Sequence, residues 1–199
     1  MLRFDYSNGR KIAKGPAIFL DRDGVINRRR PNDYVLDFSQ FEFVLGIRAA
    51  LKQLSELRLP MIVISNQAAV GKGLLDAAGL EEITVRMREL LLEDGVVLMA
   101  AYYCPHRQDE NCACRKPKPG LLLQAAGDLA IELKRSVFVG DSESDVEAAR
   151  AVGVSPILFS SVIHRSNIEK SLIATSADDL FAAVVRSLHD AEALHSQEA

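Results

Sequence analysis

The sequence predicts an α/β fold: a doubly wound, mainly parallel sheet with helices on both faces. Short apolar runs rich in Val, Ile, Leu and Phe recur without polar alternation, which is typical of strands buried on both faces. Segments with helical apolar spacing lie between these runs, and such alternation predicts an open α/β sheet. The 199 residues, 48% of them hydrophobic, suffice for one domain of this kind.

The order of the expected elements follows from these patterns. We expect strands at residues 17–20, 61–64, 96–101, 137–139 and 154–159. We expect helices at residues 47–57, 80–92, 121–133 and 146–152, and a final amphipathic helix from residue 177. Residues 1–16 are interpreted as a short extension or an edge hairpin that turns at Ser7-Asn8-Gly9, and residues 195–199 as a polar, frayed tail.

The remaining body, residues 17–194, is expected to form one domain without a separate cap domain. Neither the segment 28–46 nor the loop 104–114 is long enough to contain such a cap. We therefore expect an open site bordered by residues 28–43 and by the 104–114 loop.

Charge and hydropathy exclude several classes of partner. A formal net charge of -3 and a pI near 5.8 provide no basic field for nucleic acid, although residues 28–30 are three consecutive arginines. No apolar run approaches the roughly 18–20 residues of a membrane span, and the N-terminus lacks a signal-peptide core. We expect a cytoplasmic protein that binds neither nucleic acid nor membrane.

The first motif that carries chemistry follows the apolar run 17–20. Asp21 and Asp23 stand two positions apart, and Gly24 lets the chain turn away directly after them. Two such carboxylates repel each other unless a proton or a cation compensates, and Mg²⁺ prefers carboxylates combined with phosphate oxygens. The motif indicates a nucleophilic aspartate, a second aspartate for proton transfer and a metal ion. Acidic residues that merely cap a strand are the alternative.

Three further polar groups stand at the ends of predicted strands or ahead of a predicted helix. The chain thus presents D-x-D, then a hydroxyl and an amide, then a lysine, then G-D-x-x-x-D. This series resembles the four motifs of the haloacid dehalogenase superfamily of phosphohydrolases, which implies a Rossmann-like fold. The later groups are Ser65-Asn66, Arg115-Lys116, and Asp141 with Asp145.

The three cysteines of the chain lie close together around one histidine. Cys104, His106, Cys112 and Cys114 form the pattern C-x-H-x5-C-x-C. Three thiolates and one imidazole make a complete tetrahedral Zn²⁺ set, and four protein ligands leave no open position. We therefore predict a structural zinc ion; three buried thiols beside a surface histidine are the alternative.

A narrower resemblance comes from this zinc loop, which runs directly into C-R-K-P-K-P-G. Together with D-R-D-G-V-I-N, S-N-Q and G-D-S, it is similar to the D-glycero-manno-heptose 1,7-bisphosphate phosphatases and the related histidinol-phosphate phosphatases, over roughly residues 17–160. The resemblance implies a Mg²⁺-dependent phosphatase acting on a small phosphorylated metabolite. The expected reaction removes the 7-phosphate of the heptose bisphosphate. Histidinol-phosphate hydrolysis and a non-catalytic, zinc-stabilised binding module are the alternatives.

The resemblance also implies roles for the acidic residues. Asp21 would be the nucleophile that forms an aspartyl-phosphate. Asp23 would protonate the leaving oxygen and then activate water, and we expect repulsion from Asp21 to help it keep its proton. Mg²⁺ would be held by Asp21, the backbone carbonyl of Asp23 and Asp141. Asp145 would either support the metal site or only stabilise the helix turn.

The remaining motif residues would bind the substrate. The resemblance implies that Ser65, Asn66 and Lys116 hold the transferring phosphoryl group and that Arg115 contacts another part of the substrate. Lys118 is a second nearby lysine, but the motif selects Lys116 because it stands next to the zinc loop. The resemblance also implies a monomer.

The chain departs from this family at two places. Arg28-Arg29-Arg30 make the segment after the first motif more basic, ahead of an aromatic position that Tyr34 matches. Guanidinium groups bind phosphate or carboxylate well, so the run predicts a clamp for a second anion, with a solvated loop as the alternative. Lys72 stands where an arginine is expected, which weakens bidentate recognition there. Both departures bear on the identity of the substrate.

Overall fold

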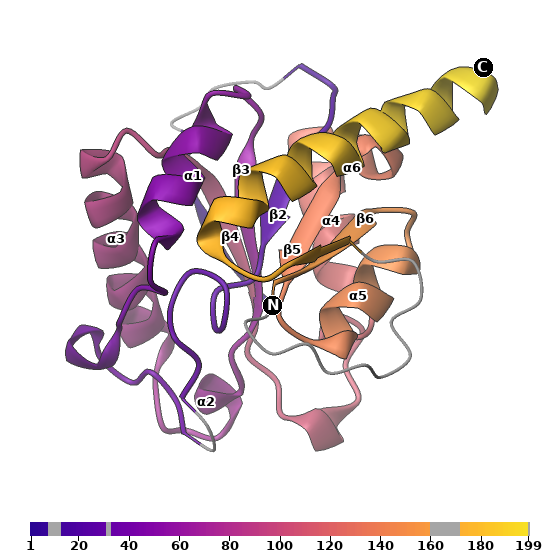
Figure 1. The fold of residues 1–199 in the computed structure, drawn as a ribbon. Helices are drawn as coiled ribbons and strands as arrows, with labels where there is room; N and C mark the ends of the chain where they lie inside the picture. The colour runs from indigo at the N-terminus through magenta and orange to yellow at the C-terminus, as the bar shows by residue number, and fades with distance from the viewer. Residues whose placement is uncertain (8–12, 31–32, 160–171, 199) are drawn as a thin grey trace.

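The computed structural model describes residues 1–7, 13–30, 33–159 and 172–198. These residues form a seven-stranded sheet with helices on both faces (Figure 1). The strands are β1 (Leu2–Asp5), β2 (Ile18–Leu20), β3 (Met61–Asn66), β4 (Leu98–Cys104), β5 (Val137–Gly140), β6 (Ser155–Phe159) and β7 (Leu172–Ala174). Their order is β1-β4-β3-β2-β5-β6-β7; β1 pairs antiparallel with β4, and the other pairs are parallel. The predicted fold class is confirmed.

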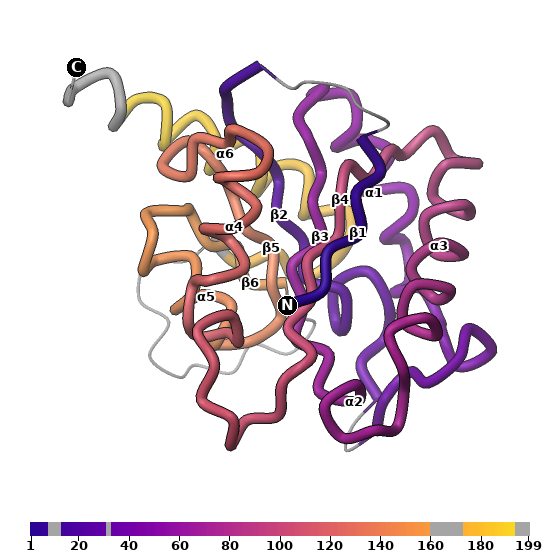
Figure 2. Tube along the Cα trace, turned by 180° about the vertical axis from the view of Figure 1, so that it is seen from behind, coloured from indigo at the N-terminus to yellow at the C-terminus, as the bar shows by residue number. Residues whose placement is uncertain are grey.

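The helices divide between the two faces of the sheet. They are α1 (Ile47–Ser55), α2 (Ala68–Gly71), α3 (Ala77–Glu93), α4 (Gly120–Leu129), α5 (Glu143–Arg150) and α6 (Ala177–Glu198). Buried residues of α1, α3 and α6 share one hydrophobic cluster, whereas those of α4 and α5 share another. Figure 2 shows the second face, with α4 and α5 towards the viewer and β1 beside β4.

The central strand β2 contributes to both clusters. Ile18 and Leu20 point into the cluster with α1, α3 and α6, whereas Phe19 points into the cluster with α4 and α5. All three side chains are fully buried. Burial on both faces explains why this strand is an unbroken apolar run in the sequence.

Several element ends differ from the predicted ones. β4 extends to Cys104, so the first cysteine of the cluster belongs to the strand. α4 ends at Leu129 because Ala130 adopts a left-handed conformation with φ 52°, although the apolar pattern continues beyond it. α6 continues to Glu198, into the segment predicted as a polar tail; residues with good helix propensity such as Ala and Glu fill its last turns.

Three short elements were not predicted as strands or helices in their own right. β1 lies at the sheet edge and pairs with β4; the N-terminal hairpin stays a prediction, because residues 8 and 9 of its turn lie outside the described residues. α2 and β7 have four and three residues, too few for a periodic pattern. None of the described helices is long and apolar enough to cross a membrane.

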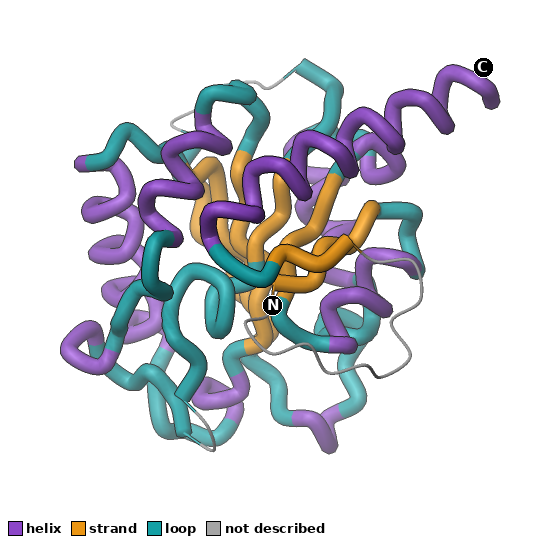
Figure 3. The backbone as a smooth tube through the Cα atoms, in the orientation of Figure 1, coloured by secondary structure: helices purple, strands orange, loops and turns teal. Residues whose placement is uncertain are grey.

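The topology directs the motif residues to one end of the sheet. β2 pairs with β3 on one side and β5 on the other, with Leu20 opposite both Val63 and Val139. The carboxyl ends of these strands therefore meet where the strand order reverses, which is where open α/β sheets bind ligands. The β2–α1 loop and the β4–α4 loop lie at this same end, in the lower part of Figure 3. Among its described residues the β2–α1 loop contains a 3-10 turn at Phe38–Gln40 and isolated β-bridges at Asp23, Asn27 and Phe43, and no cap domain.

The division between core and surface gives a matched pair of leucines. We expect Leu51→Ala to lower the free energy of unfolding by about 2–5 kcal/mol, because Leu51 on α1 is fully buried and its loss leaves a cavity. Leu123→Ala on α4 is the control, since that side chain is 52% exposed and its loss should stay within about 0.5 kcal/mol. Urea unfolding of both variants provides the measurement. Equal losses would contradict the assignment of the core.

Candidate active site

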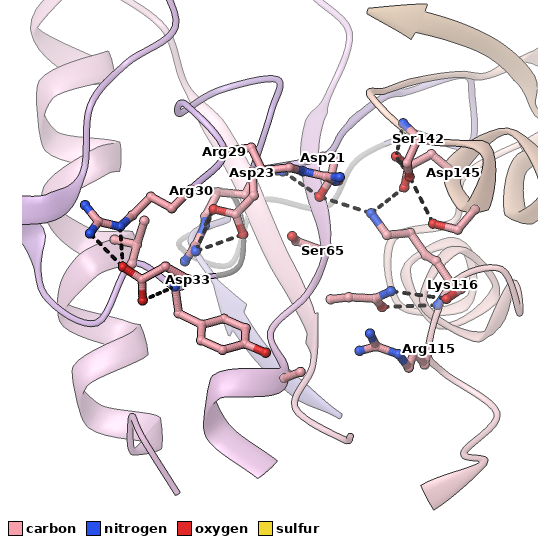
Figure 4. Close-up of a pocket in the computed structure, with 16 residues that line it drawn as sticks. Asp21, Asp23, Arg29, Arg30, Asp33, Ser65, Arg115, Lys116, Ser142 and Asp145 are labelled. Atoms are coloured by element: carbon pink, nitrogen blue, oxygen red, sulfur yellow. Dashed lines mark hydrogen bonds and ion pairs between the residues drawn. The ribbon is translucent and has the colours of Figure 1, made fainter. Parts of the chain in front are cut away.

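Asp21 is the first residue after β2, and its side chain is almost completely buried. Its backbone N–H donates to the Val139 carbonyl at 2.9 Å, which extends the pairing of β2 with β5 by one residue. The backbone N–H of Arg22 donates to Asp21 Oδ1 at 2.7 Å and orients the carboxylate. The carboxylate lines a pocket of about 340 Å³ at the carboxyl ends of the strands (Figure 4).

Gly24 allows the turn after Asp21 to approach the end of β5. Its φ of +95° is a conformation that favours glycine. A Cβ atom at this position would come within 1.8 Å of Asp141 Oδ2. A side chain at this position would therefore displace the Asp141 carboxylate from its place beside the turn.

Lys116 is the lysine that lies beside Asp21. Its Nζ is 3.0 Å from Asp21 Oδ1 and 2.6 Å from Asp145 Oδ1, and it donates to the Ile64 carbonyl at 3.1 Å. Burial opposes its charge, but the two carboxylates outweigh burial and raise the pKa of Lys116. The exposed Lys118 instead donates to Asn111. The geometry agrees with the choice of Lys116 over Lys118.

The two polar residues at the end of β3 have different surroundings. Asn66 donates from Nδ2 to the carbonyl of Lys116 at 3.2 Å and accepts from its backbone N–H at Oδ1, at 3.1 Å. Its side chain therefore positions the backbone of Lys116. Asn66 also lines the pocket, and its expected contact with the phosphoryl group stays a prediction. The buried Ser65 hydroxyl accepts from Gln67 Nε2 at 3.2 Å and lines the pocket beside Asp21.

The carboxylate of Asp23 accepts hydrogen bonds from three side chains. Nη2 of the buried Arg22 donates to its two oxygens at 2.9 and 3.0 Å. Asn27 Nδ2 and Gln67 Nε2 donate at 2.9 and 2.7 Å. Burial by itself raises the pKa of Asp23, but Arg22 and the two amides outweigh it and hold the pKa below its usual value. The expectation that repulsion from Asp21 keeps a proton here is therefore wrong for this arrangement.

Three carboxylates other than that of Asp23 face one another at the carboxyl ends of β2 and β5. Oxygen atoms of Asp21, Asp141 and Asp145 lie within 4.8 Å of one another. Burial raises the pKa of Asp21 to about 6, although Lys116 opposes the shift. Burial and the charge of Asp21 raise the pKa of Asp141 to about 7. Negative charge is thus in excess, and a hard divalent cation with oxygen ligands would fit this group.

Asp145 holds the α5 end of this group together. Its Oδ2 accepts from the backbone N–H groups of Asp141 and Ser142, both at 3.1 Å, and from the Ser142 hydroxyl at 2.6 Å. With Ser142 it forms a capping box at the start of α5. Its other oxygen pairs with Lys116. Asp145 thus stabilises the helix turn and also pairs with Lys116; its support of a metal site stays a prediction.

The cysteine cluster lies at the end of β4 and in the loop that leads to α4. Cys104 Sγ is 3.5 Å from both His106 Nδ1 and Cys112 Sγ. Cys114 Sγ is 3.3 Å from His106 Nδ1 and 3.6 Å from Cys112 Sγ. Zn–S bonds of about 2.3 Å in a tetrahedron place sulfur atoms roughly 3.8 Å apart, so these four residues fit a tetrahedral metal ion. All three cysteines are free thiols.

Comparison with known proteins shows that this chain is similar to phosphatases. The family model described as HAD-hydrolase-like matches residues 113–191. A Helicobacter pylori D-glycero-beta-D-manno-heptose-1,7-bisphosphate 7-phosphatase is 44% identical over 138 residues, 69% of this chain and 78% of the relative. A Mycobacterium tuberculosis D-glycero-alpha-D-manno-heptose-1,7-bisphosphate 7-phosphatase is 42% identical over 139 residues, 69% of this chain and 73% of the relative.

The chain belongs to the haloacid dehalogenase superfamily of phosphatases. A solved structure, the D,D-heptose 1,7-bisphosphate phosphatase from B. bronchiseptica complexed with magnesium and phosphate, resembles this phosphatase with a TM-score of 0.74 and 30% identity. The match covers 92% of this chain and 99% of that one, so the two proteins share the fold over nearly their full lengths.

The phosphatase site includes residues to which the sequence analysis assigned no role. Arg22 and Gln67 stand inside quoted motifs, between the two aspartates and after Ser65-Asn66, and both hold Asp23. Asn27 closes the first motif and contacts the same carboxylate. Their positions inside the quoted motifs were the available signal in the sequence, whereas their burial and their contacts with Asp23 are visible only in the structure.

The close approach of Gly24 to Asp141 gives a testable consequence. We expect Gly24→Ala to weaken Mg²⁺ binding by about 10- to 100-fold, because the new Cβ displaces a carboxylate of the acidic group. Gly95→Ala is the matched control: its φ is +84°, so it carries similar backbone strain, but its Cβ meets no atom within 4 Å. Isothermal titration with Mg²⁺ and thermal unfolding of both variants give the comparison. Equal Mg²⁺ affinities would show that Asp141 is not held in place by this contact.

Proposed function

We propose that this phosphatase hydrolyses the 7-phosphate of D-glycero-D-manno-heptose 1,7-bisphosphate in a Mg²⁺-dependent reaction. The observation that carries the proposal is the buried contact of Asp21 with Lys116, which pairs a nucleophile with a cation for the phosphoryl group. The names of the two relatives described above support the choice of substrate. Because those relatives differ in the anomer, the proposal covers both anomers.

In the first step, an oxygen of Asp21 attacks the phosphorus atom, and the bond to the heptose oxygen breaks. An aspartyl-phosphate forms, and the leaving oxygen takes a proton from Asp23. Lys116 and Ser65 neutralise and bind the oxygens of the transferring group, where charge compensation matters most for phosphoryl transfer. When bound to Asp21 and Asp141, Mg²⁺ supplies further compensation of this charge.

In the second step, water attacks the aspartyl-phosphate, and Asp23 accepts its proton. Asp21 is released with inorganic phosphate. The donors around Asp23 favour its anionic form, which suits this base role. For the acid role, the negative phosphoryl group of the arriving substrate raises the pKa of Asp23 by charge repulsion. Arg22 holds the carboxylate in one orientation through both steps.

The sugar hydroxyl groups of the substrate have room on the side of the cysteine loop. A second pocket of about 410 Å³ adjoins the first and shares Asn66, Arg115 and Lys116 with it. Arg115 donates to the His106 carbonyl at 3.3 Å, so the cluster that holds Zn²⁺ in this proposal also orients the arginine that binds the substrate. The monomeric state and the cytoplasmic location stay predictions.

Phosphate release from heptose 1,7-bisphosphate and histidinol phosphate, measured in parallel with Mg²⁺, tests the proposal. We expect a clear preference for the bisphosphate in kcat/KM. Asp21→Asn should lower the rate by about 10³-fold or more because it removes the nucleophile. Asp190→Asn on α6, an exposed site away from the pocket, is the control and should leave the rate unchanged. A preference for histidinol phosphate would overturn the proposed substrate.

The proposed zinc ion gives a separate prediction. The purified protein should contain about one zinc ion per chain, and His106→Ala should lose it and unfold at a lower temperature, because three ligands hold zinc more weakly than four. His189→Ala, at an exposed position on α6, is the matched control and should retain the metal. Elemental analysis and thermal unfolding provide the measurements. Full zinc content in the His106 variant would refute this ligand set.

A further inference from the structure

The three consecutive arginines after the first motif have different partners. Arg28 Nη1 lies 3.2 Å from Glu42 Oε1, and Arg30 Nη2 lies 2.7 Å from Asp33 Oδ2; both partners belong to the same loop. Arg29 instead reaches 112 residues along the chain, where its Nη2 donates to Asp141 Oδ1 at 2.7 Å. The clamp predicted from the sequence is therefore divided, and only Arg29 contacts the acidic group of the active site.

Asp141 and Arg29 differ in how far their side chains are buried. The side chain of Asp141 is 13% exposed, and its second oxygen faces Gly24. The side chain of Arg29 is 52% exposed and lines the pocket, as Arg30 does (Figure 4). Asp141 is thus fixed by its surroundings, whereas the long arginine side chain can leave it by rotation about exposed bonds.

The same carboxylate is a ligand of the proposed Mg²⁺ site. A guanidinium 2.7 Å from Asp141 Oδ1 and a divalent cation on that carboxylate would repel each other at short range. Binding of the cation therefore weakens the ion pair between Arg29 and Asp141. The released guanidinium group can turn into the pocket, which Arg29 already lines together with Asp21.

We propose that Arg29 exchanges partners: it pairs with Asp141 until Mg²⁺ binds, and then it binds the second anionic group of the substrate. This inference rests on the proposed function, because it concerns a substrate with two anionic groups. It assigns that second group to the β2–α1 side of the pocket, next to Arg30. It also makes Mg²⁺ and a doubly anionic substrate bind cooperatively, since each favours the same position of Arg29.

Loss of Arg29 should therefore strengthen the binding of Mg²⁺ and weaken the binding of the bisphosphate substrate. Without substrate, Arg29→Gln should bind Mg²⁺ about two- to fivefold more tightly, as expected for removal of a competing, partly exposed ion pair. With Mg²⁺ present, the same variant should have a KM for heptose 1,7-bisphosphate about tenfold higher, while its KM for p-nitrophenyl phosphate stays unchanged. Arg29→Lys keeps the positive charge but loses the bidentate guanidinium group, so its Mg²⁺ affinity and its KM should lie between those of the wild type and of Arg29→Gln.

Isothermal titration of the unliganded enzyme with Mg²⁺ tests the first half independently of any substrate. Arg28→Gln is the matched control, because it removes the same charge from the same loop but from a side chain paired with Glu42. Tighter binding only in the Arg29 variant supports the exchange. Equal constants in the wild type and both variants, or the same increase in both variants, would overturn it.

Steady-state kinetics with the two substrates tests the second half. A raised KM for the bisphosphate alone supports Arg29 as its ligand, and parallel changes with both substrates would overturn that assignment. Should heptose 1,7-bisphosphate prove not to be a substrate, the proposed function fails, yet the Mg²⁺ titration still decides whether Arg29 competes for Asp141. Thermal unfolding of each variant confirms that the fold is intact.

Discussion

The site depends on one buried cation, the ammonium group of Lys116. It contacts the nucleophile after β2 through Asp21 Oδ1, the start of α5 through Asp145 Oδ1, and the backbone of β3 through the Ile64 carbonyl. Breaking such a buried pair costs about 3–5 kcal/mol, because the remaining charges stay in a medium that solvates them poorly. The same contacts that stabilise the junction of three elements thus also place the positive charge where a phosphoryl group is transferred.

The cysteine cluster holds the loop that carries Lys116. β4 ends at Cys104, and the cluster closes at Cys114, two residues before Lys116. Asn66 at the end of β3 then holds the backbone of Lys116 with one donated and one accepted hydrogen bond. A lysine in a loop is thereby fixed by two neighbouring strands, which is why a loop without regular structure can carry a residue that needs exact placement.

The sequence predicts those features of the active site that follow from hydrophobic periodicity and from the order of the strands. Parallel strands with their carboxyl ends at one edge necessarily bring Asp21, Ser65 and Asp141 together. The partners of Asp23 were missed, because the rotamers of Arg22 and Gln67 depend on packing that no spacing encodes. The contact of Arg29 with Asp141 depends on the path of an irregular loop, and the end of α4 depends on the conformation of Ala130 alone, so neither leaves a periodic signal.

The central position of β2 also determines how the site moves. The strand that carries Asp21 is hydrogen-bonded to β3 and β5 on its two sides and is buried on both faces, so its amides can exchange with solvent only when the whole sheet opens. Residues 28–30 of the β2–α1 loop are exposed, and exposed segments generally open at lower free energy than buried strands. Asp21 therefore follows a strand that is held on both sides, whereas Arg29 lies on an exposed part of the adjoining loop, where it can change its contacts without disturbing the sheet.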